Sequence, residues 1–318
     1  KTTLAECMLY EAGIINRRGS IAERNTTGDY HELEQERGNS IFSKLLHTKW
    51  KGYKINIIDT PGYDDFAGEV ISALKVADTG VMLLNAVMGV EVGTDIIWDY
   101  TERFKTPMIL AVNKLDDDNA DFDKTVREAK AHFGSNVVVV QYPRLTGAGF
   151  HEVIDVLTMT MYKFNGNGGK PEKLAIPDEE KAKADQLHKE LIEAIASNDE
   201  TLMEKYFDKG ELDEDEMKIG LKKAMINHDL FPLFSLSAER NMGSGRLMGF
   251  IDNVCPSANE MPPQKTRKGD LLTCDANGPA CIFIYKTISE PHVGELSFFK
   301  VYSGVVKSGM ELENENTG

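Results

Sequence analysis

The stretch Asp59-Thr60-Pro61-Gly62 follows the apolar run Ile55-Asn56-Ile57-Ile58 and continues as Tyr63-Asp64-Asp65-Phe66. A short apolar run rich in β-branched residues predicts a buried parallel strand, here with Asp59 at its carboxyl end. A carboxylate there can hold Mg²⁺ through water, and the Pro-Gly turn can bring the backbone N–H of Gly62 near a phosphate. Pro-Gly is also common in ordinary turns. The stretch predicts an α/β fold and leaves both interpretations of the turn open.

Similar apolar runs recur along the chain and alternate with stretches of helical length. The predicted strands are residues 55–58, 81–84, 108–112, 137–140 and 233–236, and the predicted helices include residues 2–12, 67–77 and 121–133. Residues 13–40 are polar and punctuated by glycine, so we expect a long loop there. The alternation of strands and helices predicts a doubly wound, mainly parallel sheet.

Two segments depart from this alternation. Residues 162–230 contain a glycine-rich linker, 165–169, after which Pro177 opens an amphipathic helix, and two acidic helical stretches, 202–207 and 217–225, follow. After Pro256 no helical period remains, and residues 280–285 and 295–302 resemble strands. We expect an α/β domain in residues 1–161 and 231–257, a helical insertion in 162–230, a linker in 258–268, and the first part of an antiparallel β-barrel in 269–318.

The composition excludes several classes of protein. The 318 residues carry a formal net charge of −15, whereas broad nucleic-acid binding needs clustered Lys and Arg, so we expect no DNA partner. No apolar run is long enough for a membrane helix, the start does not resemble a signal peptide, and the four cysteines are scattered, so we expect a cytoplasmic protein without a membrane partner. Because the chain opens on Lys1 and stops just after a strand-like pattern, we expect it to be a fragment.

The tripeptide Lys1-Thr2-Thr3 stands at the head of the first predicted helix. It corresponds to the end of a G-x-x-x-x-G-K-[ST] loop, in which the lysine contacts phosphate oxygens and the following hydroxyl binds Mg²⁺. Backbone N–H groups at a helix start add positive potential for a phosphate. Any helix can begin with Lys and Thr, so this tripeptide indicates a phosphate site only in combination with the other motifs of the chain.

Two more motifs follow predicted strands: Asn113-Lys114-Leu115-Asp116 comes after residues 108–112, and Ser237-Ala238 comes after residues 233–236. The Asp116 carboxylate can accept both the N1–H and the 2-amino group of guanine, a pair that adenine does not offer, while Asn113 and the Lys114 stem hold the ring. Ser237-Ala238 can offer a backbone N–H to guanine O6. The order of these motifs at successive strand ends predicts a site for GTP or GDP with Mg²⁺.

These residues resemble the translational GTPases, and elongation factor G most closely. Residues 29–41 are similar to that family's first switch, which usually ends Glu-Arg-Gly-Ile-Thr-Ile, and residues 59–66 are similar to its second switch. The similarity also covers residues 85–91, 202–206, 288–294 and 301–305. The resemblance implies a P-loop GTPase domain with a helical insertion, then the start of domain II. It also implies a monomer that contacts the ribosome, both rRNA and ribosomal proteins, through domain II and through domains outside this chain.

Besides Tyr63, three positions in the switches depart from that family's pattern. Ser40 stands where the family has a Thr that serves Mg²⁺, and it keeps both oxygens, so we expect Thr2, Ser40 and Asp59, the last through water, to be the metal ligands. Asn39 replaces an apolar gate Ile beside the catalytic water. Its amide either hydrogen-bonds that water itself or leaves the gate open, or else Asn39 is an exposed loop residue of no consequence. Asp64 replaces Val and either positions water or repels the nucleotide.

Tyr63 replaces the family's catalytic His. In the family that imidazole, which titrates near neutrality, orients the attacking water and stabilises the charge of the transition state. A phenol is neutral at pH 7 and bulkier, although it can donate one hydrogen bond. The loss of a contact that is made only in the transition state lowers the rate of hydrolysis but does not weaken the binding of GTP. We therefore expect GTP to bind normally and to be hydrolysed slowly or not at all.

The leading interpretation is a divergent paralogue of elongation factor G, a ribosome-dependent GTP switch in translocation with weakened hydrolysis. One alternative is a ribosomal protection protein, which shares this amino-terminal architecture but displaces a drug from the ribosome. Another is a regulatory protein that binds GTP without hydrolysing it and for which the nucleotide is purely structural; it would bind GDP and GTP with equal affinity.

Overall fold

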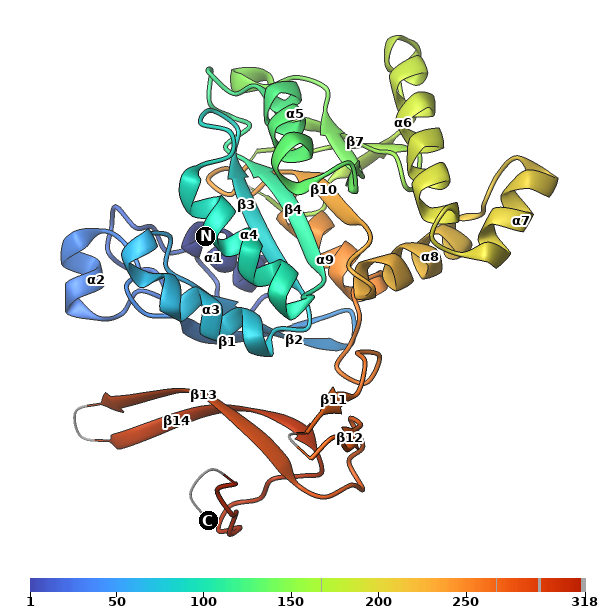
Figure 1. The fold of residues 1–318 in the computed structure, drawn as a ribbon. Helices are drawn as coiled ribbons and strands as arrows, with labels where there is room; N and C mark the ends of the chain where they lie inside the picture. The colour runs from blue at the N-terminus through green and yellow to red at the C-terminus, as the bar shows by residue number, and fades with distance from the viewer. Residues whose placement is uncertain (167, 267, 291–292, 316–318) are drawn as a thin grey trace. The chain divides into compact units, whose positions relative to one another are not determined.

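The computed structural model describes residues 1–166, 168–266, 268–290 and 293–315 (Figure 1). The chain divides into two compact units, Lys1–Cys255 and Pro256–Gly318. Asn167 of the predicted linker 165–169 and Arg267 of the predicted linker 258–268 lie outside the described residues, as do residues 291–292 of the segment 288–294.

A four-stranded parallel sheet forms the centre of the first unit. Its strands are β3 (Gly80–Asn85), β4 (Met108–Asn113), β10 (Phe231–Ser235) and β5 (Val137–Val139), in the order β3-β4-β10-β5. Residues 108–112 of β4 are at most 1% exposed, which explains why this strand is a continuous apolar run rather than an alternating one. The predicted parallel strands at 81–84, 108–112, 137–140 and 233–236 are confirmed.

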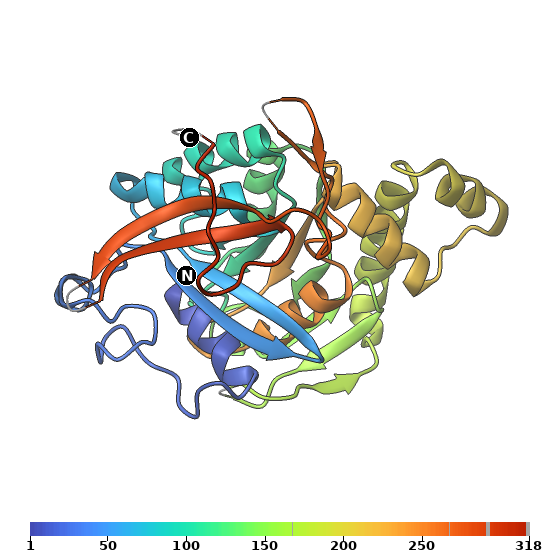
Figure 2. The same ribbon diagram turned by 90° about the horizontal axis from the view of Figure 1, so that it is seen from below.

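Helices cover both faces of this sheet (Figures 1 and 2). On one face α1 (Thr2–Glu11) packs beside α9 (Ser244–Asn253), and on the other α3 (Ala67–Val76) packs beside α4 (Val92–Phe104). Helix α5 (Phe122–Phe133) begins after Asp121, whose carboxylate accepts the backbone N–H of Lys124 as an N-cap. The predicted doubly wound arrangement is therefore confirmed.

The strand expected at residues 55–58 is present, but the prediction that it is parallel was wrong. It belongs to β2 (Tyr53–Asp59), which pairs antiparallel with β1 (Lys44–Trp50) in a separate two-stranded sheet. Lys51 and Gly52 join the two strands with φ angles of 45° and 90°, the left-handed pair of a tight hairpin turn. This turn sends the chain straight back along β1. A short 3₁₀ helix, Asp64–Phe66, follows β2.

An antiparallel sheet that the sequence did not predict follows β5. Its strands, in spatial order, are β6 (Gln141–Pro143), β7 (Glu152–Asp155), β8 (Thr160–Lys163) and β9 (Glu172–Leu174), with a 3₁₀ turn at Gly147–Gly149. Strand β9 and part of β8 therefore lie in the segment 162–230 that was predicted to be helical. These strands have three or four residues each, too short for an alternating pattern to stand out.

Three helices follow β9: α6 (Asp178–Ala196), α7 (Glu200–Lys209) and α8 (Glu214–Ile226). Asp199 caps α7, and Asp213 forms a capping box with Glu216 at the start of α8. The helical stretches predicted after Pro177 and around residues 202–207 and 217–225 are present. The division of the chain into domains stays a prediction.

Residues 13–40 are not a continuous loop, because helix α2 (Glu32–Arg37) lies within them. Glu34 is 1% exposed, and its carboxylate pairs with Lys44 of β1 at 2.9 Å. The same carboxylate accepts the backbone N–H groups of Ile41 at 2.9 Å and Phe42 at 3.0 Å. One buried carboxylate rather than an apolar stripe anchors this helix, so hydrophobic periodicity did not reveal it.

The second unit consists of antiparallel strands, as predicted. β11 (Gln264–Lys265) pairs with β12 (Leu271–Leu272), and β13 (Cys281–Glu290) pairs with β14 (Gly294–Ser303). β11 falls inside the predicted linker 258–268, and the complete barrel stays a prediction. In the described part of the chain no helix has the length and apolar character to cross a membrane.

The substitution Lys44→Ala would leave Glu34 as a buried carboxylate without its cation. We expect the free energy of unfolding at pH 7 to fall by about 3 kcal/mol, the typical effect of breaking a buried pair. Urea denaturation measures this difference. Lys49→Ala, on an exposed position of the same strand, is the matched control and should change stability by less than about 0.5 kcal/mol.

The same stability difference should depend on pH. Burial raises the pKa of Glu34, but hydrogen bonds from the Phe42 N–H and Lys44 outweigh it, so the folded pKa lies below the usual value. A carboxyl group whose pKa is lowered by folding stabilises the folded state. Its contribution is complete above the pKa of the unfolded chain, about 4.3, and is lost as the pH falls through the folded pKa. The difference between the wild type and Lys44→Ala should therefore shrink below about pH 4. A constant difference would contradict the role of this pair.

Candidate functional site

The carboxyl ends of β4 and β10 meet at one edge of the parallel sheet. The Leu236 N–H donates to the Val112 carbonyl at 3.0 Å, and the Ala238 N–H donates to Asn113 Oδ1 at 2.9 Å. Ser237 is fully buried, and two backbone hydrogen bonds of 2.9 Å join it to Met242. These bonds close residues 237–242 into a compact loop, which we call the base loop, and hold it against Asn113.

The Asp116 carboxylate lies against the base loop. Arg240 Nε is 3.5 Å from Asp116 Oδ2, and the Arg240 N–H donates to Ser237 Oγ at 3.1 Å. Lys114 is exposed and has a φ of 65°. Sequence reasoning missed Arg240, although a cation three residues after Ser237 was visible. Arg240 balances the charge of Asp116 and sets the direction of its side chain.

A second group of polar side chains surrounds the start of α1. Lys1 Nζ donates to the Pro61 carbonyl at 2.7 Å, and the hydroxyls of Thr2 and Ser40 lie 3.0 Å apart. Thr3 is half-buried in the first turn of the helix. These contacts join the start of α1 to both loops that flank the β1–β2 hairpin.

Two buried carboxylates, Asp29 and Asp59, lie among these hydroxyls. The Ser40 hydroxyl donates to Asp29 Oδ1 at 2.7 Å, while Asp59 Oδ2 is buried with no hydrogen-bond partner among the described residues. Burial raises the pKa of both carboxyls, and hydrogen bonds from Ser40 and Thr2 oppose that rise. Buried carboxylates are costly without a cation, and carboxylate and hydroxyl oxygens are the ligands that Mg²⁺ prefers. The cluster fits a divalent cation; Asp29 was not among the predicted ligands.

The residues expected to act on an attacking water are not joined to one another. Tyr63 is 59% exposed, and within the described ranges its hydroxyl makes no hydrogen bond, to Asn39 or to any other residue. Asn39 is half-buried after α2, and its side-chain oxygen is buried without a hydrogen-bond partner in the part of the chain that the structure describes. Gly62 is exposed. The Asp64 carboxylate lies against Gly93 in the first turn of α4, and a Cβ on Gly93 would collide with it. Asp64 is also close enough to Lys1 for their opposite charges to attract.

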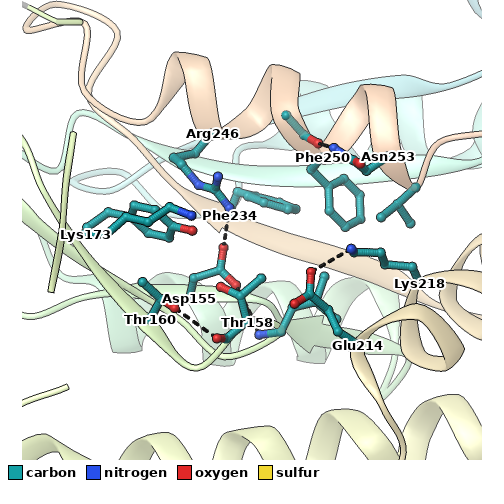
Figure 3. A pocket seen from close by; sticks show the side chains of 14 residues that line it. Asp155, Thr158, Thr160, Lys173, Glu214, Lys218, Phe234, Arg246, Phe250 and Asn253 are labelled. Carbon is teal, nitrogen blue, oxygen red and sulfur yellow. Dashed lines mark hydrogen bonds and ion pairs between the residues drawn. The ribbon is translucent and has the colours of Figure 1, made fainter. Parts of the chain in front are cut away.

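A separate cavity of about 260 Å³ lies between α9, β10 and the antiparallel sheet (Figure 3). Arg246 pairs there with Asp155 at 3.2 Å and stacks over Tyr162 at 4.0 Å, and Lys218 pairs with Glu214 at 2.6 Å. These opposite charges on its wall neutralise one another. The cavity shares none of the residues that lie at the sheet edge or at the start of α1.

The first unit thus carries two different sets of groups, one at the edge of the parallel sheet and one between the start of α1 and the loops that flank the β1–β2 hairpin. One set, around Asn113 and Asp116, suits a purine base, and the other, around Lys1, Thr2 and Asp59, suits a phosphate with a divalent cation. This division between a base end and a phosphate end defines a nucleotide-binding protein of the P-loop GTPase class.

Comparison with known proteins identifies the family. The family model of the elongation factor Tu GTP binding domain matches residues 1–257, so the chain belongs to this family of translation-factor GTPases, and membership implies guanine-nucleotide binding. A crystal structure of a protein from Thermus thermophilus is similar over 95% of this chain, with 29% sequence identity and a TM-score of 0.84. The chain spans 43% of the length of that protein. The predicted resemblance to the translational GTPases is confirmed.

Proposed function

We propose that this protein is a translational GTPase of the elongation factor G type, a ribosome-dependent switch in translocation that binds GTP but hydrolyses it slowly. The observation that carries the proposal is the contrast between the two ends of the second switch. Asp59 and Pro61 are held against Thr2 and Lys1, whereas Tyr63 is 59% exposed and makes no side-chain hydrogen bond among the described residues. Binding groups are in place, and a water-orienting imidazole is absent.

At the base end, Asp116 accepts the N1–H and 2-amino group of guanine, and Asn113 and Lys114 hold the ring. Ser237 and Ala238 shape the base loop that faces guanine O6. The pairing of Asp116 with Arg240 supports this assignment, because it places the carboxylate beside the base loop. Adenine presents neither donor, so this pairing selects guanine.

At the phosphate end, Lys1 contacts phosphate oxygens in place of the Pro61 carbonyl, and Thr3 and Gly62 add polar groups near the phosphates. Thr2, Ser40 and Asp59, the last through water, would hold Mg²⁺, with Asp29 orienting Ser40. Bound Mg²⁺ supplies positive charge to the phosphate oxygens. Because Ser40 belongs to the first switch, a nucleotide and cation that recruit its hydroxyl also order that segment.

The intact protein acts in the cytoplasm as a monomer and contacts the ribosome, both rRNA and ribosomal proteins. The family of residues 1–257 supports this partner, since translation factors act on ribosomes. We expect the intact protein to support poly(U)-directed polyphenylalanine synthesis with GTP and also with a non-hydrolysable GTP analogue, because binding rather than cleavage drives the switch. Failure with both nucleotides would favour a role outside elongation.

The substitution Asp116→Asn tests the base end. We expect GDP to bind roughly 100-fold more weakly, because two hydrogen bonds to a charged carboxylate are lost. The new amide can donate to the 2-oxo group of xanthine, so xanthosine diphosphate should bind better than it does to the wild type. Titration with a fluorescent nucleotide measures both affinities. Asp117→Asn, at the exposed neighbouring carboxylate, is the matched control, and tight GDP binding by Asp116→Asn would exclude the assignment.

The substitution Tyr63→His tests slow hydrolysis. Restoring a group that titrates near neutrality should raise ribosome-stimulated phosphate release about 10²- to 10³-fold. GTP affinity should change by less than about twofold, since the imidazole acts only in the transition state. The control Tyr53→His alters a similarly exposed tyrosine, 56% exposed at the hairpin end of β2, and should leave the rate unchanged. Equal and fast rates for the wild type and Tyr63→His would refute the proposal.

A further inference from the structure

The base loop is held from outside by a residue that no motif includes. Arg18 Nη1 donates to the Ala238 carbonyl at 3.2 Å and to the Glu239 carbonyl at 3.0 Å. Within the described ranges no carboxylate pairs with Arg18, whereas its neighbour Arg17 pairs with Glu23 at 2.8 Å on the surface. The Arg18 guanidinium therefore donates to two successive peptide carbonyls of the base loop, and its Nη1 also donates to the Cys7 sulfur at 3.5 Å.

Helix α1 contributes a second donor to the same peptide. Cys7 is fully buried, and its thiol donates to the Ala238 carbonyl at 3.1 Å. The Ala238 carbonyl thus accepts from Cys7, from Arg18 and from the Asn241 N–H of its own loop at 3.1 Å, and these three donors, of which Cys7 lies on α1, fix its direction. The C=O and the following N–H of a trans peptide point in opposite directions, and the described chain contains no cis peptide. The N–H of Glu239 must therefore point away from α1.

The backbone that carries Arg18 is itself fixed to α1. The Gly19 N–H donates to Glu6 Oε2 at 2.8 Å, and the Thr27 N–H donates to Glu6 Oε1. Glu6 is 1% exposed. A Cβ on Gly19 would lie 2.5 Å from the Asn25 carbonyl oxygen, so only glycine fits beside Arg18. Arg18 is consequently presented to the base loop from a rigid support.

Among the described backbone N–H groups of the base loop, one is left for a ligand, because those of Ser237, Asn241 and Met242 donate to carbonyls within the loop. The Ala238 N–H, which the sequence assigned to guanine O6, is taken by Asn113 Oδ1, and the Arg240 N–H is taken by Ser237 Oγ. The Glu239 N–H lies at an exposed position and donates to no group within the described ranges. It is the backbone donor that remains between these two.

We propose that Arg18 is a positioning residue for base recognition: with Cys7 it orients the peptide between Ala238 and Glu239 so that the Glu239 N–H donates to the 6-oxo group of a bound purine. The inference rests on the proposed guanine site. Arg18 itself touches no ligand. It sets the preference of the site for 6-oxopurine nucleotides over purines with a poor acceptor at position 6.

The test compares GDP with 6-thio-GDP, which keeps the N1–H and 2-amino group but replaces the 6-oxygen by sulfur, a weak acceptor. In the intact wild-type protein, GDP should bind more tightly than 6-thio-GDP. In Arg18→Ala we expect the GDP affinity to fall about tenfold, the value of one well-made hydrogen bond, and the 6-thio-GDP affinity to change by less than about twofold. Arg17→Ala is the matched control and should change neither affinity.

Arg18→Lys keeps the charge but loses the planar fork, so its GDP affinity should lie between those of the wild type and Arg18→Ala. It also provides a folded variant for the comparison if Arg18→Ala fails to fold. Equal weakening of both nucleotides, or no weakening, would show that Arg18 is merely structural and would overturn the inference. A wild type that does not distinguish GDP from 6-thio-GDP would instead remove its premise, the contact to the 6-position. The nucleotide titration of Asp116→Asn tests the proposed guanine site independently of these outcomes.

Discussion

The parallel pairing of β4 with β10 is the constraint on which the site depends. Residues 110–112 lie in register with residues 233–235, so both strands end at the same edge of the sheet. A slip of one residue would move Asn113 by about 3.3 Å relative to the base loop and break its 2.9 Å hydrogen bond with the Ala238 N–H. The base end of the site therefore depends on this register.

The phosphate end is held by contacts of another kind. Lys1 donates to the Pro61 carbonyl, and Thr2 and Ser40 share a hydrogen bond, but none of these groups belongs to the parallel sheet. The Lys1 ammonium can also bind a phosphate, and the Thr2 and Ser40 hydroxyls can also bind a cation. In the proposed site, a nucleotide that takes these contacts would shift the two loops around the hairpin, while the sheet keeps the base end in place.

The sequence predicted the parts of the molecule that local pattern encodes. Buried strands such as residues 108–112 and the motifs at their ends were found because apolar runs and spacing report burial and position. The antiparallel partner of β2 was missed, because a pattern of burial does not specify which strand pairs with which. Asp29 and Arg18 were missed because their partners are set by the fold: Arg18 contacts Ala238, 220 residues away.

The segment that joins α1 to the first switch contacts both ends of the site. Arg18 reaches the base loop, the buried Glu6 carboxylate binds the N–H groups of Gly19 and Thr27, and Asp29 accepts the Ser40 hydroxyl at 2.7 Å. A nucleotide that fixes the base loop thus restricts the same segment that presents Asp29 to Ser40. Since coupling between two contacts is reciprocal, ordering of Ser40 by a γ-phosphate and cation must favour base binding to the same extent. Tyr63 makes none of these contacts within the described ranges, so the proposed exchange for His leaves the groups around α1 in place.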